Sequence, residues 1–586
     1  MTFTPPVAEI AAALHAAAGS DSPVLDDVPL DDILAEAGRF AAEVLAPLNR
    51  VGDREGVTFR DGTVTTAPGW RDAYRRFAEG GWTGVSAPET HGGQGLPTMI
   101  EMAVQELWNA GNAAFAVGPM LTAGAIEALA AHGSEEIRAA YLPHLVSGTW
   151  TATMNLTEPQ AGSDLTLLAT RAERAGDGTC RITGQKIFIT YGEHDLTPNI
   201  VHLVLARLPD APSGTAGISL FLVPKVLPSG DRNAVAAAGI EHKLGLHGSP
   251  TCTMIFDGAT GFLVGEENRG LACMFTMMNL ARLSVGIQGV GVAERAWQGA
   301  LAYARERRQG RGPDGSGPVA IVHHPDVQVM LMRMASLVAA SRALCYACAH
   351  AIDMSRRGAP EDRRAWGDRA SLLTPLAKAY ATDAAVEVAS LGIQVHGGAG
   401  YIEETGAAQH LRDARIFSIY EGTNGIQAID LVLRKLGLGG GAAVTAITAD
   451  LLAIAHALPQ SRHDALRAMH PPLATAIDAL RAATLAMNEA VAAGQRGAAL
   501  AGAGSYLRLF ATTLAGGMLA KAAFAGGDTP GGRDTFAKAA FFAQTMLTEA
   551  PALRAAAAGS ARGLDAGAMA LLAGTDADEF REEGQQ

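Results

Sequence analysis

The sequence predicts an α+β fold built from separate subdomains, with helices at both ends and a β-rich segment between them. Apolar residues recur at helical spacing up to residue 149 and again from residue 271, whereas residues 150–270 hold short β-rich runs between Gly and Pro turns. The length of 586 residues also exceeds what one hydrophobic core supports, so several domains are expected.

The first predicted domain, residues 1–149, is helical. Apolar residues recur at helical spacing over residues 33–48, 70–79, 99–109 and 123–131. The second predicted domain, residues 150–270, is a central β domain. Its β-rich runs span residues 181–190, 200–206, 218–223 and 251–256.

The third predicted domain, residues 271–437, is a helical bundle. Its long helices are expected over residues 274–308, 327–353 and 372–391. The glycine-rich run 437–441 then predicts a linker. Residues 442–586 are predicted to form an Ala-rich helical C-terminal extension. Amphipathic helices are expected there over residues 473–493, 500–521 and 535–548.

Charge and composition argue against some functions. The chain has 46 Lys plus Arg against 59 Asp plus Glu, a net charge of −13, and no long basic run, so nucleic acid is not an expected partner. The longest uncharged run, Leu107–Ile126, contains Gly and Pro and predicts a buried helix and turn, not a membrane span. No Lys or Arg precedes Arg39, which argues against a secretory or mitochondrial presequence.

Cysteine and histidine usage predicts no metal site. Five cysteines, an odd number scattered through a long chain, favour a reducing compartment, so we expect a cytoplasmic protein. Cys345 and Cys348 have the spacing of a metal-binding pair, but they lie in an apolar, helix-like run and are predicted to be core residues. His242, His247 and the His323–His324 pair lack further ligands and are interpreted as turn or surface residues.

The run 416–427 holds the strongest candidate for a catalytic residue. Glu421 and Gly422 stand just before a predicted helix with apolar residues at helical spacing, and Thr423 or Asn424 is a suitable N-cap. Glycine lets another molecule approach the backbone closely, so a carboxylate beside it suits a general base. The alternative is a first-turn glutamate that complements the helix dipole.

Four segments, in the same order along the chain, resemble motifs of the acyl-CoA dehydrogenase family. Residues 154–164 are similar to its Thr-Glu-Pro-x-Ala-Gly-Ser-Asp motif, and residues 186–190 to its Lys-x-Trp-Ile-Thr strand. Residues 394–401 resemble Gln-x-x-Gly-Gly-x-Gly-Tyr and are followed by Arg-Asp-Ala-Arg at 412–415, while residues 420–423 are the Tyr-Glu-Gly-Thr of the family. The resemblance spans about residues 70 to 437.

Within the family the likeness is to the long, C-terminally extended branch, through residues 241–251 and 256–261 as well as the length. Members of that branch act on 3-methylmercaptopropionyl-CoA, in dimethylsulfoniopropionate breakdown, or on ordinary fatty acyl-CoAs, so the acyl group stays open. The fold implied is a helical domain, a β domain and a helical bundle, with an added helical extension.

The resemblance implies FAD-dependent α,β-dehydrogenation of an acyl-CoA to the trans-2-enoyl-CoA. Glu421 would take the α-proton and the flavin N5 the β-hydride, because no protein side chain accepts hydride. The thioester oxygen would be bound by the backbone N–H of Glu421 and a ribityl hydroxyl of FAD. Electron-transfer flavoprotein is the expected electron acceptor. Two alternatives stay open: an acyl-CoA oxidase and a non-catalytic relative.

Residues that match the family's binding positions are carried over one by one. For FAD these are Leu156, Thr157, Ser163, Phe188, Thr190, Arg307, Gln394, Gly397, Gly398 and Thr423. For the acyl-CoA substrate they are Ser163, Arg282, Tyr420 and Gly422.

Phe188 stands where the family often has Trp and is expected to pack on the isoalloxazine ring. Thr190, two residues on, is expected on the same face of the strand, near N5. Arg307 and Gln394 match residues that reach a neighbouring subunit's FAD, so a homo-oligomer, at least a dimer, is implied. The sequence departs from the family pattern after Arg307, where a Gly-rich insertion occupies 310–317.

Overall fold

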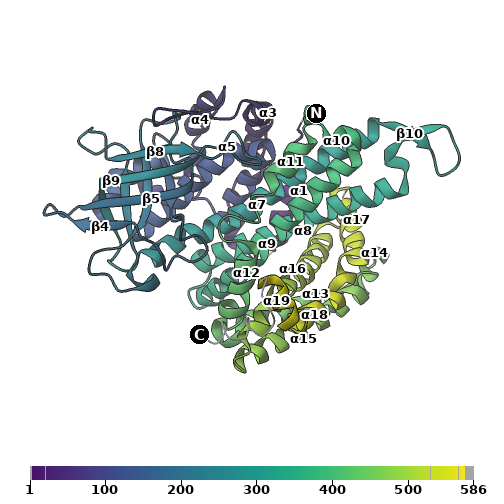
Figure 1. Ribbon diagram of the computed structural model, residues 1–586. Coiled ribbons are helices and arrows are strands. Elements are labelled where there is room, and N and C mark those ends of the chain that lie inside the picture. The colour runs from purple at the N-terminus through teal and green to yellow at the C-terminus, as the bar shows by residue number, and fades with distance from the viewer. Residues whose placement is uncertain (1–2, 20–21, 528–529, 565, 574–586) are drawn as a thin grey trace. The chain divides into compact units, whose positions relative to one another are not determined.

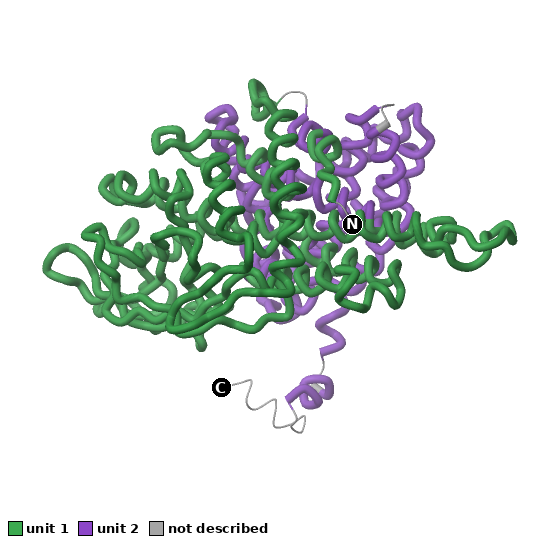
Figure 2. The backbone as a smooth tube through the Cα atoms, turned by 90° about the horizontal axis from the view of Figure 1, so that it is seen from above, with its two compact units in different colours: residues 1–11, 22–334, 381–421 green, residues 12–21, 335–380, 422–586 purple. Residues whose placement is uncertain are grey.

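The computed structural model describes residues 3–19, 22–527, 530–564 and 566–573 (Figure 1). The chain divides into two compact units, coloured separately in Figure 2. Unit 1 comprises Met1–Ala11, Ser22–Met334 and Ala381–Glu421, and unit 2 comprises Ala12–Asp21, Ala335–Tyr380 and Gly422–Gln586. The border between the units therefore falls directly after Glu421.

The N-terminal part is helical, as predicted. Its helices are α1 (Val7–Ala18), α2 (Leu30–Phe40), α3 (Ala46–Glu55), α4 (Trp70–Glu79), α5 (Thr98–His132) and α6 (Glu135–Val146), with a π-helical turn at Ala41–Leu45 joining α2 to α3. The two helices predicted within α5 meet at a kink, where Asn112 has non-helical φ and ψ of −161° and 95°. Its Oδ1 accepts the N–H of Phe115 at 3.1 Å, so Asn112 caps the second half of α5.

The central domain is one seven-stranded sheet. Its strands are β3 (Thr151–Asn155), β4 (Arg171–Arg174), β5 (Cys180–Thr190), β6 (Ile200–Ala206), β7 (Ser219–Pro224), β8 (Val235–Ile240) and β9 (Thr251–Val264). The order is β3-β6-β7-β9-β5-β4, with β8 also on β9. Only the β3–β6 pair is parallel. β9 is longer than the predicted run because it pairs with β5, β7 and β8 in turn. Two small hairpins lie outside the sheet: β1 (Thr58–Arg60) with β2 (Thr63–Thr65), and β10 (Arg308–Arg311) with β11 (Pro318–Ala320).

One long helix, α7 (Gly270–Glu306), lies in unit 1. Its 37 residues span about 55 Å at 1.5 Å per residue. At its first residue the N–H of Gly270 donates to the carbonyl oxygen of Ile218 at 2.8 Å. A Cβ at Gly270 would lie 2.1 Å from the backbone of Ser219, so this close approach requires glycine. At the other end Tyr303 stacks on His396 with ring centroids 4.5 Å apart.

The helices that follow carry the candidate catalytic segment. They are α8 (Pro325–Arg357), α9 (Arg363–His396), α10 (Gly398–Tyr401), α11 (Ala407–Ala414) and α12 (Asn424–Asp430), the last continued by a π-helical turn at Leu431–Lys435. Cys345 and Cys348 are both fully buried in α8, as expected for core residues. The glycine-rich run predicted as a linker folds instead as a 3₁₀ turn, Leu438–Gly441, in which Gly439, Gly440 and Gly441 all have positive φ.

The C-terminal extension is helical. Its helices are α13 (Ala442–Ala457), α14 (Asp464–Arg467), α15 (His470–Ala492), α16 (Arg496–Gly526), α17 (Pro530–Thr545), α18 (Ala550–Gly559) and α19 (Ala566–Ala573). α15, α17 and α18 pack around α16, whose Gly502 comes so close to α18 that a Cβ would lie 2.0 Å from the carbonyl oxygen of Ala557. The predicted stretch 574–586 lies outside the described residues.

Several helices are long and apolar enough, by length and composition alone, to cross a membrane. In the described part of the chain there are five, at Thr98–His132, Gly270–Glu306, Pro325–Arg357, Leu438–Gln460 and Arg496–Gly526. In four of them 67–83% of the most apolar 18-residue window is buried within the protein, and in Leu438–Gln460 the share is 28%. The predicted burial of the run Leu107–Ile126, which lies in α5, is confirmed.

Candidate active site

Glu421 has an unusual backbone conformation. It follows α11 in unit 1 and has φ of +54°, a left-handed value that non-glycine residues rarely adopt and that costs about 1–3 kcal/mol. Arg282, a buried residue of α7, donates from Nε to the carbonyl oxygen of Glu421 at 3.4 Å. Strain of this kind persists where the surrounding structure enforces it, and it is characteristic of functional sites.

The preceding residue, Tyr420, is tied to α7. Its hydroxyl donates to Oε1 of the fully buried Gln288. Burial, and next the charge of Glu421, raise the pKa of Tyr420 well above its usual value, so the phenol stays protonated. The hydroxyl is thus occupied inside the protein, and contact between Tyr420 and substrate stays a prediction.

The segment that follows belongs to unit 2 and starts α12. Thr423 is the N-cap, with its Oγ1 accepting the N–H of Ile426 at 3.2 Å, as the sequence predicted. The carbonyl oxygen of Gly422 accepts from Lys378 Nζ at 2.9 Å and from Gln427 Nε2 at 3.3 Å. These contacts hold the peptide between Gly422 and Thr423, one residue beyond Glu421.

The loop that holds the predicted flavin residues Leu156, Thr157 and Ser163 is anchored on β5. The carbonyl oxygen of Leu156 accepts from Lys186 Nζ at 2.9 Å, and that of Thr157 accepts the N–H of Ile187 at 2.9 Å. Leu156 and Thr157 are half-buried and Ser163 is exposed. The loop is therefore held from the protein side while its outer surface remains open.

A buried ion pair supports this loop. Lys186 Nζ lies 2.8 Å from Glu158 Oε1, and both side chains are buried. Glu158 also accepts from the N–H and hydroxyl of Thr170 and from the N–H of Ala169. Burial alone would raise the pKa of Glu158, but the charge of Lys186 and these hydrogen bonds outweigh it and hold that pKa below its usual value. Burial lowers the pKa of Lys186 to about 8 despite its partner.

Phe188 presents its ring to the outside. It is 58% exposed and has φ of +60°, at a point where the register between β5 and β9 shifts between Lys186 and Ile189. The expectation that Phe188 and Thr190 share a face rested on regular strand alternation, and that alternation is interrupted here by the bulge. The argument for a shared face therefore fails, although both residues border the same bulge.

The remaining predicted cofactor residues lie together at the far end of α7. Arg307 is its C-cap, and Gln394, Gly397 and Gly398 are exposed at the end of α9 and the start of α10. The stacking of Tyr303 on His396 brings the two segments together. A Cβ at Gly397 or Gly398 would meet no atom within 4 Å, so the surface there is open, and Gly397 has φ of +61°. The predicted insertion 310–317 lies in the β10–β11 hairpin beside them.

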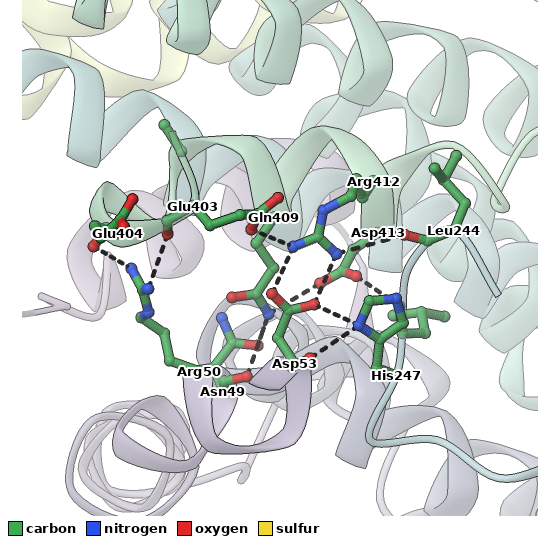
Figure 3. A network of polar contacts seen from close by, with 12 residues as sticks. Asn49, Arg50, Asp53, Leu244, His247, Glu403, Glu404, Gln409, Arg412 and Asp413 are labelled. Atoms are coloured by element: carbon green, nitrogen blue, oxygen red, sulfur yellow. Dashed lines mark hydrogen bonds and ion pairs between the residues drawn. The ribbon is translucent and has the colours of Figure 1, made fainter. Parts of the chain in front are cut away.

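A polar junction in unit 1 links α3, α11 and the loop before β9 (Figure 3). Arg412 forms two hydrogen bonds to Asp53, at 2.7 and 2.5 Å, and His247 Nδ1 lies 3.0 Å from the same carboxylate. Asp413 accepts the N–H of Leu246 at 2.6 Å. The junction thus joins the helix that leads to Glu421 to the loop that enters β9, the strand paired with the end of β5.

Sequence reasoning missed four buried residues that lie in or contact the loop at 156–163 or the segment around Glu421: Lys186, Glu158, Gln288 and Lys378. One signal was present for Gln288, the lone polar side chain in the apolar stretch 285–293. The Glu158–Lys186 pair carried no such signal, because the partners are 28 residues apart and meet only through the sheet.

Family comparisons agree with the order of motifs along the chain. Residues 30–149, 153–259 and 268–436 match the N-terminal, middle and C-terminal domains of acyl-CoA dehydrogenase, and residues 443–566 match the family described as acetyl-CoA dehydrogenase C-terminal like.

Two relatives and two solved structures are informative. The 3-methylmercaptopropionyl-CoA dehydrogenase of Ruegeria pomeroyi is 50% identical over 75% of this chain and 77% of its own. A butyryl-CoA dehydrogenase of Syntrophomonas wolfei is 37% identical over 71% of each. Caenorhabditis elegans ACDH-11, solved with C11-CoA, has a TM-score of 0.80 at 21% identity, covering 93% of this chain and 91% of that one. A Bacillus anthracis acyl-CoA dehydrogenase complexed with FAD has a TM-score of 0.72 at 22% identity, covering 90% and 87%.

Proposed function

Because the chain belongs to the acyl-CoA dehydrogenase family, we propose that it removes the α- and β-hydrogens of an acyl-CoA thioester, with Glu421 as the base. The observation that carries the proposal is the left-handed backbone of Glu421, held at its carbonyl oxygen by Arg282. A glutamate that only complements the helix dipole needs no strained backbone. The helix-dipole interpretation of Glu421 therefore leaves its left-handed conformation unexplained.

Glu421 would take the α-proton of the bound thioester. Its own backbone N–H, with a ribityl hydroxyl of FAD, would bind the thioester oxygen and stabilise the negative charge that develops there. Ser163, Arg282, Tyr420 and Gly422 are kept as proposed substrate-binding residues. Glu421 would then serve twice, with its carboxylate taking the proton and its backbone N–H binding the thioester oxygen. The left-handed turn at Glu421 would fix the orientation of both groups.

FAD is the proposed cofactor, and when bound it accepts the β-hydrogen as hydride. The residues present fit a flavin: an aromatic ring that would ordinarily be buried, Phe188, is 58% exposed beside the half-buried Thr157. Thr190 and Thr423 remain proposed contacts. Stacking of a flat ring system on Phe188 would bury that apolar surface.

We also propose that two copies of the chain share each FAD. Figure 1 shows β5, the strand that carries Phe188, on one side of unit 1, and α10 and the β10 hairpin on the other. Arg307, the C-cap of α7, and Gln394, Gly397 and Gly398 belong to the segments beside α10. The second set lies at the C-terminal end of α7, a helix about 55 Å long, which supports the proposal that the two sets serve different FAD molecules. A homo-oligomer, at least a dimer, would complete the site.

The proposed substrate is 3-methylmercaptopropionyl-CoA, which would place the protein in dimethylsulfoniopropionate breakdown. The 50% identity to the Ruegeria pomeroyi enzyme supports it, and the butyryl-CoA relative at 37% supports a short fatty acyl-CoA as the alternative. We further propose electron-transfer flavoprotein as acceptor, a cytoplasmic location, and four domains at 1–149, 150–270, 271–437 and 442–586.

The test is anaerobic bleaching of the flavin absorbance, titrated with 3-methylmercaptopropionyl-CoA and butyryl-CoA in parallel. Glu421→Gln is the key variant, and Glu404→Gln, at an exposed position in the turn before α11, is its matched control. Bleaching in the wild type and the control, but not in Glu421→Gln, would support the base, and the relative rates would rank the substrates. A yellow wild type that neither substrate bleaches would refute this activity on both. Peroxide formation in air would favour an acyl-CoA oxidase. Purified protein that takes up no FAD would favour a non-catalytic relative.

A further inference from the structure

Lys378 is a fully buried lysine in the middle of α9. Its neighbours Leu376, Ala377 and Ala379 are also buried, so its ammonium group is surrounded by core. Burying a charged amine is costly unless the amine is hydrogen-bonded, so the groups that it binds indicate its role. Lys378 Nζ donates to the carbonyl oxygen of Gly422 and to Oδ1 of Asn424, both at 2.9 Å. These are the first and third residues after Glu421.

The turn that Lys378 binds is conformationally unusual. Gly422 has φ of +86° directly after Glu421 at +54°, so two left-handed residues stand in succession. An L-residue holds such a value only where contacts on the adjoining peptides prevent it from relaxing. The carbonyl oxygen of Gly422 accepts from two side-chain donors, Lys378 and Gln427.

The anchor is itself braced. Asn424, which accepts from Lys378, donates from Nδ2 to the carbonyl oxygen of Ala379 at 3.2 Å, so α9 and the first residue of α12 are joined in both directions. The cap of Thr423 on Ile426 fixes the other side of the same peptide. Rotation about Gly422, the movement that would release Glu421, is therefore opposed by α9.

We propose that Lys378 is a positioning residue for Glu421, holding the Gly422 carbonyl and thereby the left-handed turn that carries the base. This inference rests on the proposed function, since positioning matters only if Glu421 takes a proton. Lys378 itself does not touch the thioester. Its loss should slow proton removal far more than it weakens substrate binding.

The test compares Lys378→Met with Lys521→Met in the full-length flavoprotein. Methionine keeps the length and apolar stem of lysine. Lys521 is the matched control because it also lies in unit 2, is partly buried, and donates from Nζ to a backbone carbonyl oxygen, that of Ala17 at 3.2 Å. Two quantities are measured: kcat and KM per bound flavin, and hydrogen–deuterium exchange of peptides covering residues 416–427.

For Lys378→Met we expect kcat to fall roughly 10²-fold with KM little changed, the scale of loss that follows from misplacing a reacting group by about 1 Å. Exchange at residues 421–425 should accelerate in Lys378→Met and not in Lys521→Met. Should Lys378→Met fail to fold, Asn424→Ala removes the second anchor and should give a smaller loss in the same direction.

Three results would overturn the inference. They are an unchanged kcat per flavin in Lys378→Met, an equal loss in Lys521→Met, and unchanged exchange across residues 421–425. If neither acyl-CoA bleaches the flavin of the wild-type protein, the proposed function is wrong, whatever the role of Lys378. The exchange measurement would then decide alone whether Lys378 holds the turn.

Discussion

The buried carboxyl of Asp413 should make folding stability depend on pH in a defined way. Asp413 accepts from Leu246 and Gln409 inside the junction of Figure 3. Burial raises its pKa from 3.8 to about 6. At 1.36 kcal/mol per pH unit, a shift of this size amounts to about 3 kcal/mol.

The sign follows from the two protonation states. Below pH 4 Asp413 is protonated in both the folded and the unfolded chain. The buried carboxyl is then neutral, so folding incurs no cost for burying a charge at this position. As the pH rises from about 4 towards 6, the folded state still binds a proton that the unfolded state has already released, so stability falls. Above pH 6 both states have released the proton and the loss is complete. Between pH 5 and pH 8 the expected loss from this group alone is about 1.4 kcal/mol.

Asp413→Asn removes the titrating carboxyl and so isolates its contribution to the pH dependence of the free energy of unfolding. The variant should lose about 1.4 kcal/mol less stability than the wild type between pH 5 and pH 8, as measured by urea unfolding at several pH values. Any constant cost, such as a poorer contact with Gln409, cancels in this difference. Asp478→Asn, on an exposed face of α15, is the control and should run parallel to the wild type. Parallel curves for Asp413→Asn would refute the reasoning.

Three further outcomes are expected. Lys186→Met leaves the Glu158 carboxylate buried without its cation, so the free energy of unfolding measured in urea should fall by about 3–5 kcal/mol. Adding Glu158→Gln should restore part of that loss. An unchanged free energy of unfolding in the single variant, or no recovery in the double variant, would contradict the role of the pair. Phe188→Ala removes the exposed ring, and FAD affinity by equilibrium dialysis should fall about tenfold, or 1.4 kcal/mol; an unaltered Kd would argue against flavin packing on it. Gly245→Ala would place a Cβ 2.5 Å from the backbone of Arg412, so a lowered Tm is expected, and an unchanged Tm would show that the loop is not held there.

Features governed by local chemistry could be predicted from the sequence. Thr423 was identifiable as an N-cap because a hydroxyl residue stood directly before apolar residues at helical spacing, and α4 (Trp70–Glu79) matches the predicted range. β6 is likewise the predicted run 200–206, in which every residue but His202 is apolar and all are buried.

Features governed by distant contacts could not. The bulge at Phe188 arises from the register of β9 against β5, which the local alternation of side chains does not encode, so alternation cannot place Phe188 and Thr190 on one face. Lys378 meets Gly422 only when α9 lies beside the start of α12. The glycine-rich run 437–441 permits either a linker or a tight turn, and its composition does not distinguish the two.

The length of α7 has a consequence for genetics. With each cofactor shared between copies as proposed, a chain defective at Phe188 and a chain defective at Arg307 carry their lesions at opposite ends of the helix. A mixed dimer of the two would combine both lesions in one site and leave the other intact. Two inactive alleles would therefore complement one another, each rescuing the half of the site that its partner had lost.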